Sequence, residues 1–233
     1  MDQWTSVELG ECTKFLSGGT PPPDEIYWNG DIPWISAKSL HESRISTSED
    51  KLTELGAQTG TRLVPPGTVL ILVRGMMLRK RIPLGIATTA VTFNQDVKAL
   101  IAKPEIEPEY LLYALMQREE YLLQLVETAS HGTGKLSTDV LGSTVIPLPP
   151  LPEQRAIAAI LSTWDEAITL TRRLIEALQQ RKRALMDVLL TGQVRFPGFD
   201  EEWETVRLGE IATFHNGRAY QKSEWEKTGT PVV

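Results

Sequence analysis

The sequence predicts a mixed α/β domain followed by one long α-helix. Three observations lead to this fold class: short β-like runs fill much of the first 150 residues, a helical period interrupts them, and a proline-rich stretch then opens a long amphipathic segment. We expect a first domain over 1–150, a long helix over 151–192 and a further segment over 193–233.

The first domain owes its predicted sheet to several apolar runs. Residues 69–73 are uninterrupted apolar, which indicates a strand buried on both faces. Further strands are expected at 7–18, 32–36, 84–93 and 97–102. A helix is expected over 107–127, because Pro108 suits a first turn and one face carries Leu111, Leu115, Leu122 and Val126. A short helix and a strand should follow over 136–149.

Four prolines between 147 and 152 stiffen the approach to the long helix. They fit a rigid junction better than a proline-rich ligand, because a helix begins directly at Pro152 and runs to Leu190, about 57 Å at 1.5 Å per residue. Gly192 would supply its left-handed cap. One face of this helix, in steps of three and four residues, carries an apolar seam: Ile157, Leu161, Trp164, Ile168, Ile175, Leu178, Leu185 and Leu189.

Thr171 and Lys182 occupy the two remaining positions of this seam. A single helix does not bury such a seam, so a second helix is the favoured partner. The alternative is an amphipathic helix that lies on its own domain.

Composition excludes several classes of protein. The chain has 41% hydrophobic and 23% charged residues, which is typical of globular proteins. Cys12 is the only cysteine and the three histidines are scattered, so no disulfide framework or metal cluster is expected. No apolar run is long enough to span a bilayer, and the first residues are acidic and polar. We therefore expect no membrane association and a cytoplasmic location.

The charge is unevenly distributed. The net charge is −6, yet no acidic residue lies between Glu54 and Asp96. That stretch contains five cations: Arg62, Arg74, Arg79, Lys80 and Arg81. A basic binding face on an acidic protein is one explanation, and chance clustering on a solvated surface is the other.

The stretch "HGTGKLS" at 131–137 resembles the end of a nucleotide-binding loop. The mechanism of such a loop requires a glycine at position 129 and a Ser or Thr at position 136, where this chain has Ala129 and Leu136. The pattern therefore argues against a nucleotide site. The stretch is either a glycine-rich connection from helix to strand or a loop that approaches phosphates of another kind.

The chain also repeats itself. "WTSVELGECTKFLSGGTP" near the start matches "WETVRLGEIATFHNGRAY" at an offset of 199 residues, and "GDIPWI" is echoed by "GTPVV" at the end. A period this long indicates a duplicated domain rather than a solenoid. Residues 193–233 therefore look like the opening of a second copy.

Taken in order, these stretches resemble a known family. The pattern "W..V.LGE", "SGGTP", "YWNGDIPWIS", "FNQDVKAL", the Gly-Thr loop, "IPLPPLPEQRAIAAIL" and "LLTGQVRF" is similar to the specificity (S) subunit of type I restriction–modification systems. In that family two target-recognition domains alternate with two long helices, which pack as an antiparallel coiled coil. Each domain reads one half of a split site in double-stranded DNA.

The resemblance also implies the partners. The helices space the two half-sites and dock two modification subunits, which carry S-adenosylmethionine and methylate adenine, while a separate restriction subunit uses ATP. The S subunit is not an enzyme and needs no cofactor. Because this chain resembles a half-length form, we expect it to form a homodimer that reads an interrupted palindrome.

DNA contacts are expected at the acid-free stretch and at the glycine loop. Arg74, Arg79, Lys80 and Arg81 would contact phosphates, or guanine through two-pronged bonds. Thr133 and Lys135 would donate to a phosphate that Gly132 and Gly134 allow to approach. Gln95 could pair with adenine, although amides in such a turn are more often structural. Trp28 and Trp34 are expected to pack rather than to stack on bases.

Two other functions compete with DNA recognition. An assembly protein could use the helix without touching DNA. A DNA-modifying enzyme is the weaker alternative, because the sequence contains no S-adenosylmethionine loop, no Asn/Asp-Pro-Pro-aromatic tetrapeptide and no Walker loop.

Overall fold

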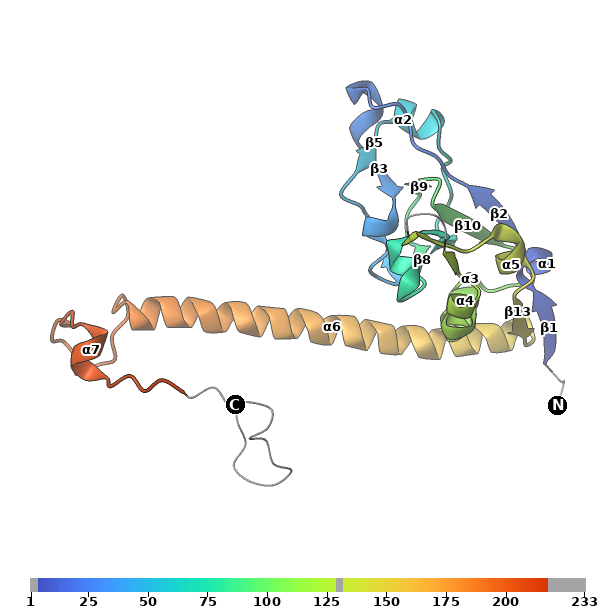
Figure 1. Ribbon diagram of the computed structural model, residues 1–233. Coiled ribbons are helices and arrows are strands. Elements are labelled where there is room, and N and C mark those ends of the chain that lie inside the picture. Colours follow the sequence, from blue (N-terminus) through green and yellow to red (C-terminus); the bar gives the residue numbers. More distant parts are fainter. Residues whose placement is uncertain (1–3, 129–131, 218–233) are drawn as a thin grey trace. The chain divides into compact units, whose positions relative to one another are not determined.

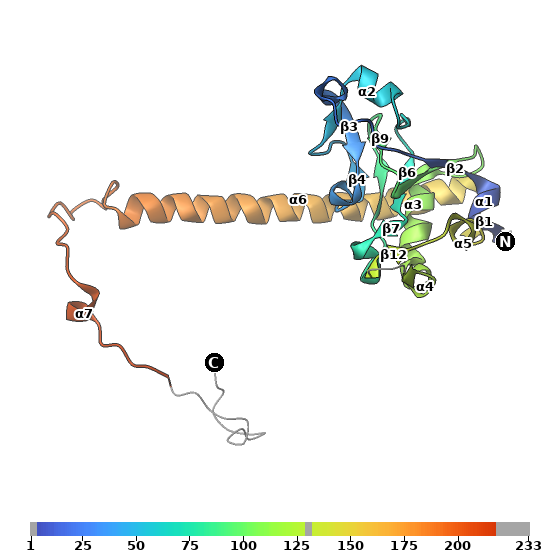
Figure 2. The same ribbon diagram turned by 45° about the horizontal axis from the view of Figure 1, so that its top comes forward.

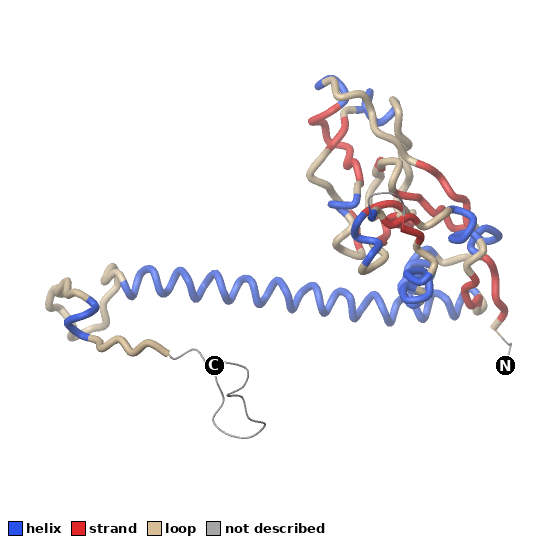
Figure 3. The backbone as a smooth tube through the Cα atoms, in the orientation of Figure 1, coloured by secondary structure: helices blue, strands red, loops and turns tan. Residues whose placement is uncertain are grey.

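The computed structural model describes residues 4–128 and 132–217. It falls into two compact units, Met1–Thr171 and Arg172–Val233. The first unit is rich in strands, and α6 is one continuous helix over Leu151–Leu190, as the tube in Figure 3 shows. This confirms the predicted class of a mixed α/β domain followed by a long helix. Within the described ranges, no helix has the length and apolar character needed to cross a membrane.

Among the residues that the structure describes, the first unit has thirteen strands. They are β1 (Thr5–Glu8), β2 (Thr13–Ser17), β3 (Trp28–Ile35), β4 (Arg44–Ile45), β5 (Lys51–Leu52), β6 (Val69–Leu72), β7 (Arg74–Gly75), β8 (Leu84–Ala87), β9 (Thr92–Phe93), β10 (Val97–Ala102), β11 (Glu127–Thr128), β12 (Gly134–Lys135) and β13 (Val145–Leu148).

Short helices connect these strands. The α-helices are α1 (Leu9–Cys12), α2 (Glu54–Gln58), α3 (Pro108–Gln117), α4 (Glu119–Gln124), α5 (Thr138–Gly142), α6 (Leu151–Leu190) and α7 (Leu208–Ile211). Elsewhere in the described ranges, short 3₁₀ helices are η1 (Glu25–Tyr27), η2 (Ala37–Ser39) and η3 (Met76–Arg79).

The core lies around a five-stranded sheet of order β2-β10-β6-β8-β4. Strand β6 sits in its middle, and all four of its residues are buried, which confirms the strand predicted from the apolar run. Helix α3 packs against β6, β8 and β10. Its Leu111 and Leu115 are completely buried, so the apolar face predicted for this helix supplies the second layer of the core.

A second sheet, of order β5-β3-β9, holds the aromatic motif of the sequence. The rings of Trp28 and Trp34 meet edge to face with centroids 5.2 Å apart. The Trp28 indole donates to the Pro22 carbonyl at 2.8 Å, and the Trp34 indole donates to the Gly19 carbonyl at 3.0 Å. Both indole N–H groups are therefore hydrogen-bonded within the domain, which agrees with the expectation that these rings pack rather than stack on bases.

Two predicted elements are interrupted. The strand expected over 7–18 contains the single turn α1, which buries both Leu9 and Cys12 and is closed by a hydrogen bond from the Thr13 hydroxyl to the Leu9 carbonyl. The helix expected over 107–127 is two helices. The Arg118 N–H bonds the Leu115 carbonyl, three residues back, and this tightened turn ends α3 before α4 begins.

The segment at 203–217, which belongs to the second unit, corresponds in sequence to the start of the chain. Helix α7 occupies the positions of α1 shifted by 199 residues, so the repeat extends to local structure. Burial differs, because Leu9 is fully buried whereas the equivalent Leu208 is 61% exposed. Gly192, with φ +73°, provides the left-handed cap expected after α6. The "GTPVV" echo and His131 lie outside the described residues.

The stability of the first unit should fall at alkaline pH. Burial raises the pKa of the Cys12 thiol from its ordinary value of 9.0 to about 11. The thiol is ionised more readily in the unfolded chain, so its contribution is complete below pH 9 and is lost as the pH rises through 11. Urea unfolding between pH 7 and 11 should show this fall, and Cys12→Ala should make it shallower; Tyr110 and Tyr113, whose pKa values burial also raises, contribute the remainder. Equal slopes in both proteins would contradict the assignment.

Candidate nucleic-acid interface

A small sheet brings the two predicted cationic segments together. Its strand order is β11-β12-β7, and Lys135 of β12 is paired directly with Arg74 of β7. Figure 2 shows these two strands side by side near α4. Both side chains are exposed. Like charges on directly paired residues destabilise a sheet, so this pairing favours an anionic partner. Glu127 is paired with Lys135 on its other side and offsets part of that charge.

The basic loop, residues 76–81, directly follows β7 and therefore continues the edge of the domain formed by β7 and β12. Arg79, Lys80 and Arg81 are all exposed, whereas Leu78, directly before them, is 1% exposed and fixes the loop to the core. The Ile82 N–H donates to Glu119 Oε1 of α4 at 2.8 Å, which holds the other end. Among the described residues, none of these three cations is in an ion pair. The loop is therefore a firmly held support for three unpaired cations.

The glycine loop lies against the basic loop. A Cβ at Gly132 would be 3.7 Å from Arg79 Nη1, and Gly132 itself has φ +76°. At Gly134 a Cβ would come within 2.8 Å of the Leu78 Cβ. Gly134 therefore has a structural role, because it lets β12 approach the basic loop closely. Thr133 is half-buried and Lys135 is exposed.

Gln95 lies next to the same edge. It is exposed, and its Oε1 accepts a hydrogen bond from the Thr20 hydroxyl at 2.8 Å. The following Asp96 carbonyl accepts from the Val73 and Arg74 N–H groups, at 2.8 and 3.3 Å. The neighbouring Asn94 is 8% exposed, and its side chain accepts from the Asp96 N–H, as a structural turn residue does. Of the predicted site residues, Arg74, Arg79, Lys80, Arg81, Gln95, Thr133 and Lys135 thus belong to adjoining segments of one edge.

The first turns of α6 are fixed to this domain by a residue that sequence reasoning missed. Gln154 is 1% exposed and makes three hydrogen bonds. Its Oε1 accepts from the Glu107 N–H at 2.9 Å, and its Nε2 donates to the carbonyls of Pro149 and Glu105, at 2.9 and 3.1 Å. One buried amide therefore joins α6, the proline-rich junction and the turn before α3.

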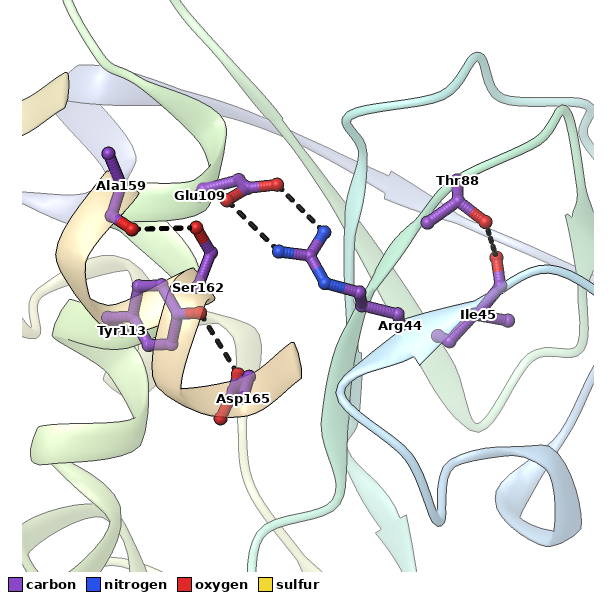
Figure 4. Close-up of polar contacts among 8 residues, drawn as sticks. All are labelled: Arg44, Ile45, Thr88, Glu109, Tyr113, Ala159, Ser162 and Asp165. Carbon is purple, nitrogen blue, oxygen red and sulfur yellow. Dashed lines mark hydrogen bonds and ion pairs between the residues drawn. The ribbon is translucent and has the colours of Figure 1, made fainter. Parts of the chain in front are cut away.

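A second contact holds α6 three turns later. Figure 4 shows Tyr113 and Glu109, one turn apart on α3, directed toward Asp165 of α6 and Arg44 of β4. The Tyr113 hydroxyl donates to Asp165 Oδ2 at 2.9 Å, while Arg44 donates two bonds to Glu109, at 2.8 and 3.2 Å. Burial, and then the bond to Asp165, raises the pKa of Tyr113. The helix is therefore held at two points, and its direction relative to the sheet is fixed within the first unit.

Most of the predicted seam on α6 is exposed. Trp164, Ile168 and Leu178 are 67%, 47% and 54% exposed. Leu161, Ile175 and Leu185 are exposed as well, whereas Leu189 is half-buried. Ile157 differs from the others because it packs against the core of the first unit. The uncovered part of the seam therefore begins at Leu161.

An α/β domain that gathers exposed cations at one edge, and that is anchored to a helix with an uncovered apolar face, has the features of a recognition module. The family model for the type I restriction modification DNA specificity domain matches residues 1–180. The chain therefore belongs to the type I restriction–modification specificity family.

Individual relatives agree with this assignment. The chain is 34% identical over 173 residues to the Escherichia coli type I restriction enzyme EcoR124I/EcoR124II specificity subunit, covering 73% of this chain and 42% of that one. It is 30% identical to the MjaIX specificity subunit of Methanocaldococcus jannaschii, covering 97% and 55%. The chain thus spans about half the length of these relatives.

Solved structures support the fold. The HsdS subunit from Thermoanaerobacter tengcongensis matches with a TM-score of 0.55 at 23% identity, over 81% of this chain and 45% of that one. A chain from a study of complex assembly and conformational transition of the type I R-M system matches with a TM-score of 0.58 at 25% identity, over 81% and 46%.

Proposed function

We propose that this chain is a DNA-recognition subunit that binds one half of a bipartite site in double-stranded DNA. The observation that carries the proposal is the direct pairing of Arg74 with Lys135 beside the loop that presents Arg79, Lys80 and Arg81. Membership of the specificity family supports it. A phosphate backbone would relieve the repulsion among these cations, and Gln95 at the same edge would contact a base.

A gel shift with random duplex DNA at low salt tests the proposal. A recognition subunit should bind such DNA through its cations and lose affinity steeply as salt rises. A pure assembly protein would leave the DNA unshifted at every salt concentration. A gel shift whose strength does not fall as the salt concentration rises would also contradict binding through the cations of this edge.

We propose further that the uncovered seam of α6 pairs two copies of the chain. Six apolar side chains on one face of a helix are exposed among the described residues: Leu161, Trp164, Ile168, Ile175, Leu178 and Leu185. Water contact at such a seam is unfavourable, and a second identical helix would cover it. The paired subunit would present two identical recognition domains, so its site would be an interrupted palindrome.

The paired subunit would act as a non-catalytic platform. The family resemblance implies that modification subunits, which carry S-adenosylmethionine, dock on the helices, and that a restriction subunit with ATP-dependent activity joins the complex. This chain would supply sequence recognition and spacing, and its partners would supply the chemistry. Purified chain together with modification subunits should therefore methylate adenine, whereas the chain alone should not.

Placing a charge in the seam should separate the two copies. Leu178→Asp puts a carboxylate at the middle of the apolar face, where burial in a helix pair would cost several kcal/mol. Light scattering should give a mass near twice 26.0 kDa for the wild type and near 26.0 kDa for the variant. Leu170→Asp is the matched control, because Leu170 is exposed on α6 and faces away from the seam. A monomeric wild type at micromolar concentration would contradict the pairing.

A further inference from the structure

The basic loop begins with an apolar side chain that the core does not use. Met76 is 56% exposed, whereas Met77 packs partly buried against the core and Leu78 is 1% exposed. The loop is therefore fixed by the two residues that follow Met76 and not by Met76 itself. Single exposed apolar residues are common on protein surfaces, so the surroundings of Met76 decide whether it has a use.

The local backbone places Met76 among cations. Helix η3 (Met76–Arg79) is a 3₁₀ turn, in which side chains three residues apart lie on the same face. Met76 therefore shares its face with Arg79, which is exposed. Arg74, also exposed, lies two residues before Met76 on β7. An apolar side chain thus stands within the group of cations that we propose to contact phosphates.

The residue pair next to Met76 has no side chains. Gly75 of β7 is paired directly with Gly134 of β12, and the adjoining pair is Arg74 with Lys135. Met76 directly follows the glycine pair, so this register of the small sheet offers no side chain that could cover it. The exposure of Met76 therefore belongs to an ordered part of the domain rather than to a loose loop end.

A methionine in this position has a defined chemistry toward DNA. Its thioether is apolar, flexible and polarisable, so it gains by contact with an apolar group. Among the base edges of the major groove, that group is the C5-methyl of thymine. The other use of an exposed methionine is as a wedge between base steps in the minor groove. Arg79 on the same face favours the major groove, where arginine makes its two-pronged contact with guanine.

We propose that Met76 is a specificity-determining residue that packs against the C5-methyl group of a pyrimidine in the major groove. The chain would then prefer thymine at one position of its half-site, close to the base or phosphate that Arg79 contacts. The proposal rests on the DNA binding proposed above, and it adds a base contact that uses no hydrogen bond.

Uracil substitution tests this contact, because uracil differs from thymine only by the methyl group. Each thymine of a duplex selected by the full chain from a random library is replaced in turn by uracil. The wild type should lose affinity about fourfold at one position, the effect of one methyl-sized group left unburied. Met76→Ala should bind the thymine and uracil duplexes equally. Met116→Ala, which removes an exposed methionine of α3 outside the basic loop, is the matched control and should keep the fourfold difference.

Cytosine methylation provides a second test at the same position. A pair of 5-methylcytosine with guanine carries the same hydrogen-bonding groups as the unmethylated pair, so a difference between them reports the methyl group alone. The wild type should bind the methylated duplex about fourfold more tightly, and Met76→Ala should abolish this preference. Equal binding of both duplexes by the wild type would overturn the contact.

The outcomes separate this contact from DNA binding itself. Met76→Ala should keep the wild-type salt slope, because the change removes no charge. A chain that shifts no DNA would overturn both proposals. A salt-dependent shift without any uracil effect that depends on Met76, or a selected half-site that lacks thymine, would overturn the methyl contact alone. Equal affinity for thymine and uracil, with a DNA bend that Met76→Ala removes, would identify a wedge and also overturn it.

Discussion

Replacing Arg79, Lys80 and Arg81 together by glutamate is expected to reduce DNA affinity about a hundredfold or more at moderate salt. These three side chains are exposed on a loop held at Leu78 and Ile82, and they make no ion pair in the described part of the chain. Each phosphate contact contributes about 0.9 to the dependence of log K on log salt, so losing three should lower the slope by about 2.7.

A matched control separates this loop from general electrostatics. Lys14 and Lys103 are exposed at the far end of β2 and β10, where Thr13 is paired with Ala102. Changing both to glutamate alters the net charge by −4 away from Arg74, against −6 for the loop variant. The salt slope of this control should match that of the wild type. If the loop variant keeps the wild-type slope, the loop is not part of the interface.

Gln154→Ala is expected to be the most destabilising polar substitution in the first unit, by about 2 to 4 kcal/mol. The change removes an amide group that makes three hydrogen bonds. It leaves three buried backbone groups without their partner: the Glu107 N–H and the carbonyls of Pro149 and Glu105. Urea unfolding followed by circular dichroism measures the loss.

Two further variants show whether the hydrogen bonds are responsible. Gln154→Met keeps most of the volume without the amide, so it should be nearly as unstable as Gln154→Ala. Arg155→Ala removes an exposed pair with Glu107 at 3.2 Å and should cost less than about 1 kcal/mol. If Gln154→Met is as stable as the wild type, the amide has only a space-filling role.

The elements with strong local patterns could be predicted from the sequence. The apolar run at 69–73 predicted a buried strand, which is β6 over Val69–Leu72. The three-and-four spacing with a terminal glycine predicted a long helix, which is α6 with Gly192 as its cap. The repeat at an offset of 199 residues predicted that residues 193–233 open a second copy, and α7 lies at the positions that correspond to α1.

The elements that depend on distant contacts could not be predicted. The turn α1 breaks a strand-like pattern, because Leu9 and Cys12 must both reach the core. Gln154 looks like an ordinary polar residue near the start of a helix, and its importance depends on Glu105 and Glu107, almost fifty residues earlier.

The candidate interface was only partly visible in the sequence. Charge composition identified the basic stretch, and a glycine motif identified the loop at 132–135. Their contact depends on the pairing of Lys135 with Arg74, 61 residues apart, which no local pattern encodes. The structure also gives Gly134 a packing role against Leu78 that the motif did not indicate.

Selection of duplexes from a random DNA library by the purified full chain tests the central claim most directly. Two identical heads on an antiparallel helix pair should enrich an inverted repeat with a gap of fixed length between its halves, and Leu178→Asp should enrich the single half alone. Enrichment of one continuous asymmetric motif by the wild type, or of no motif at all, would contradict recognition by a paired half-subunit.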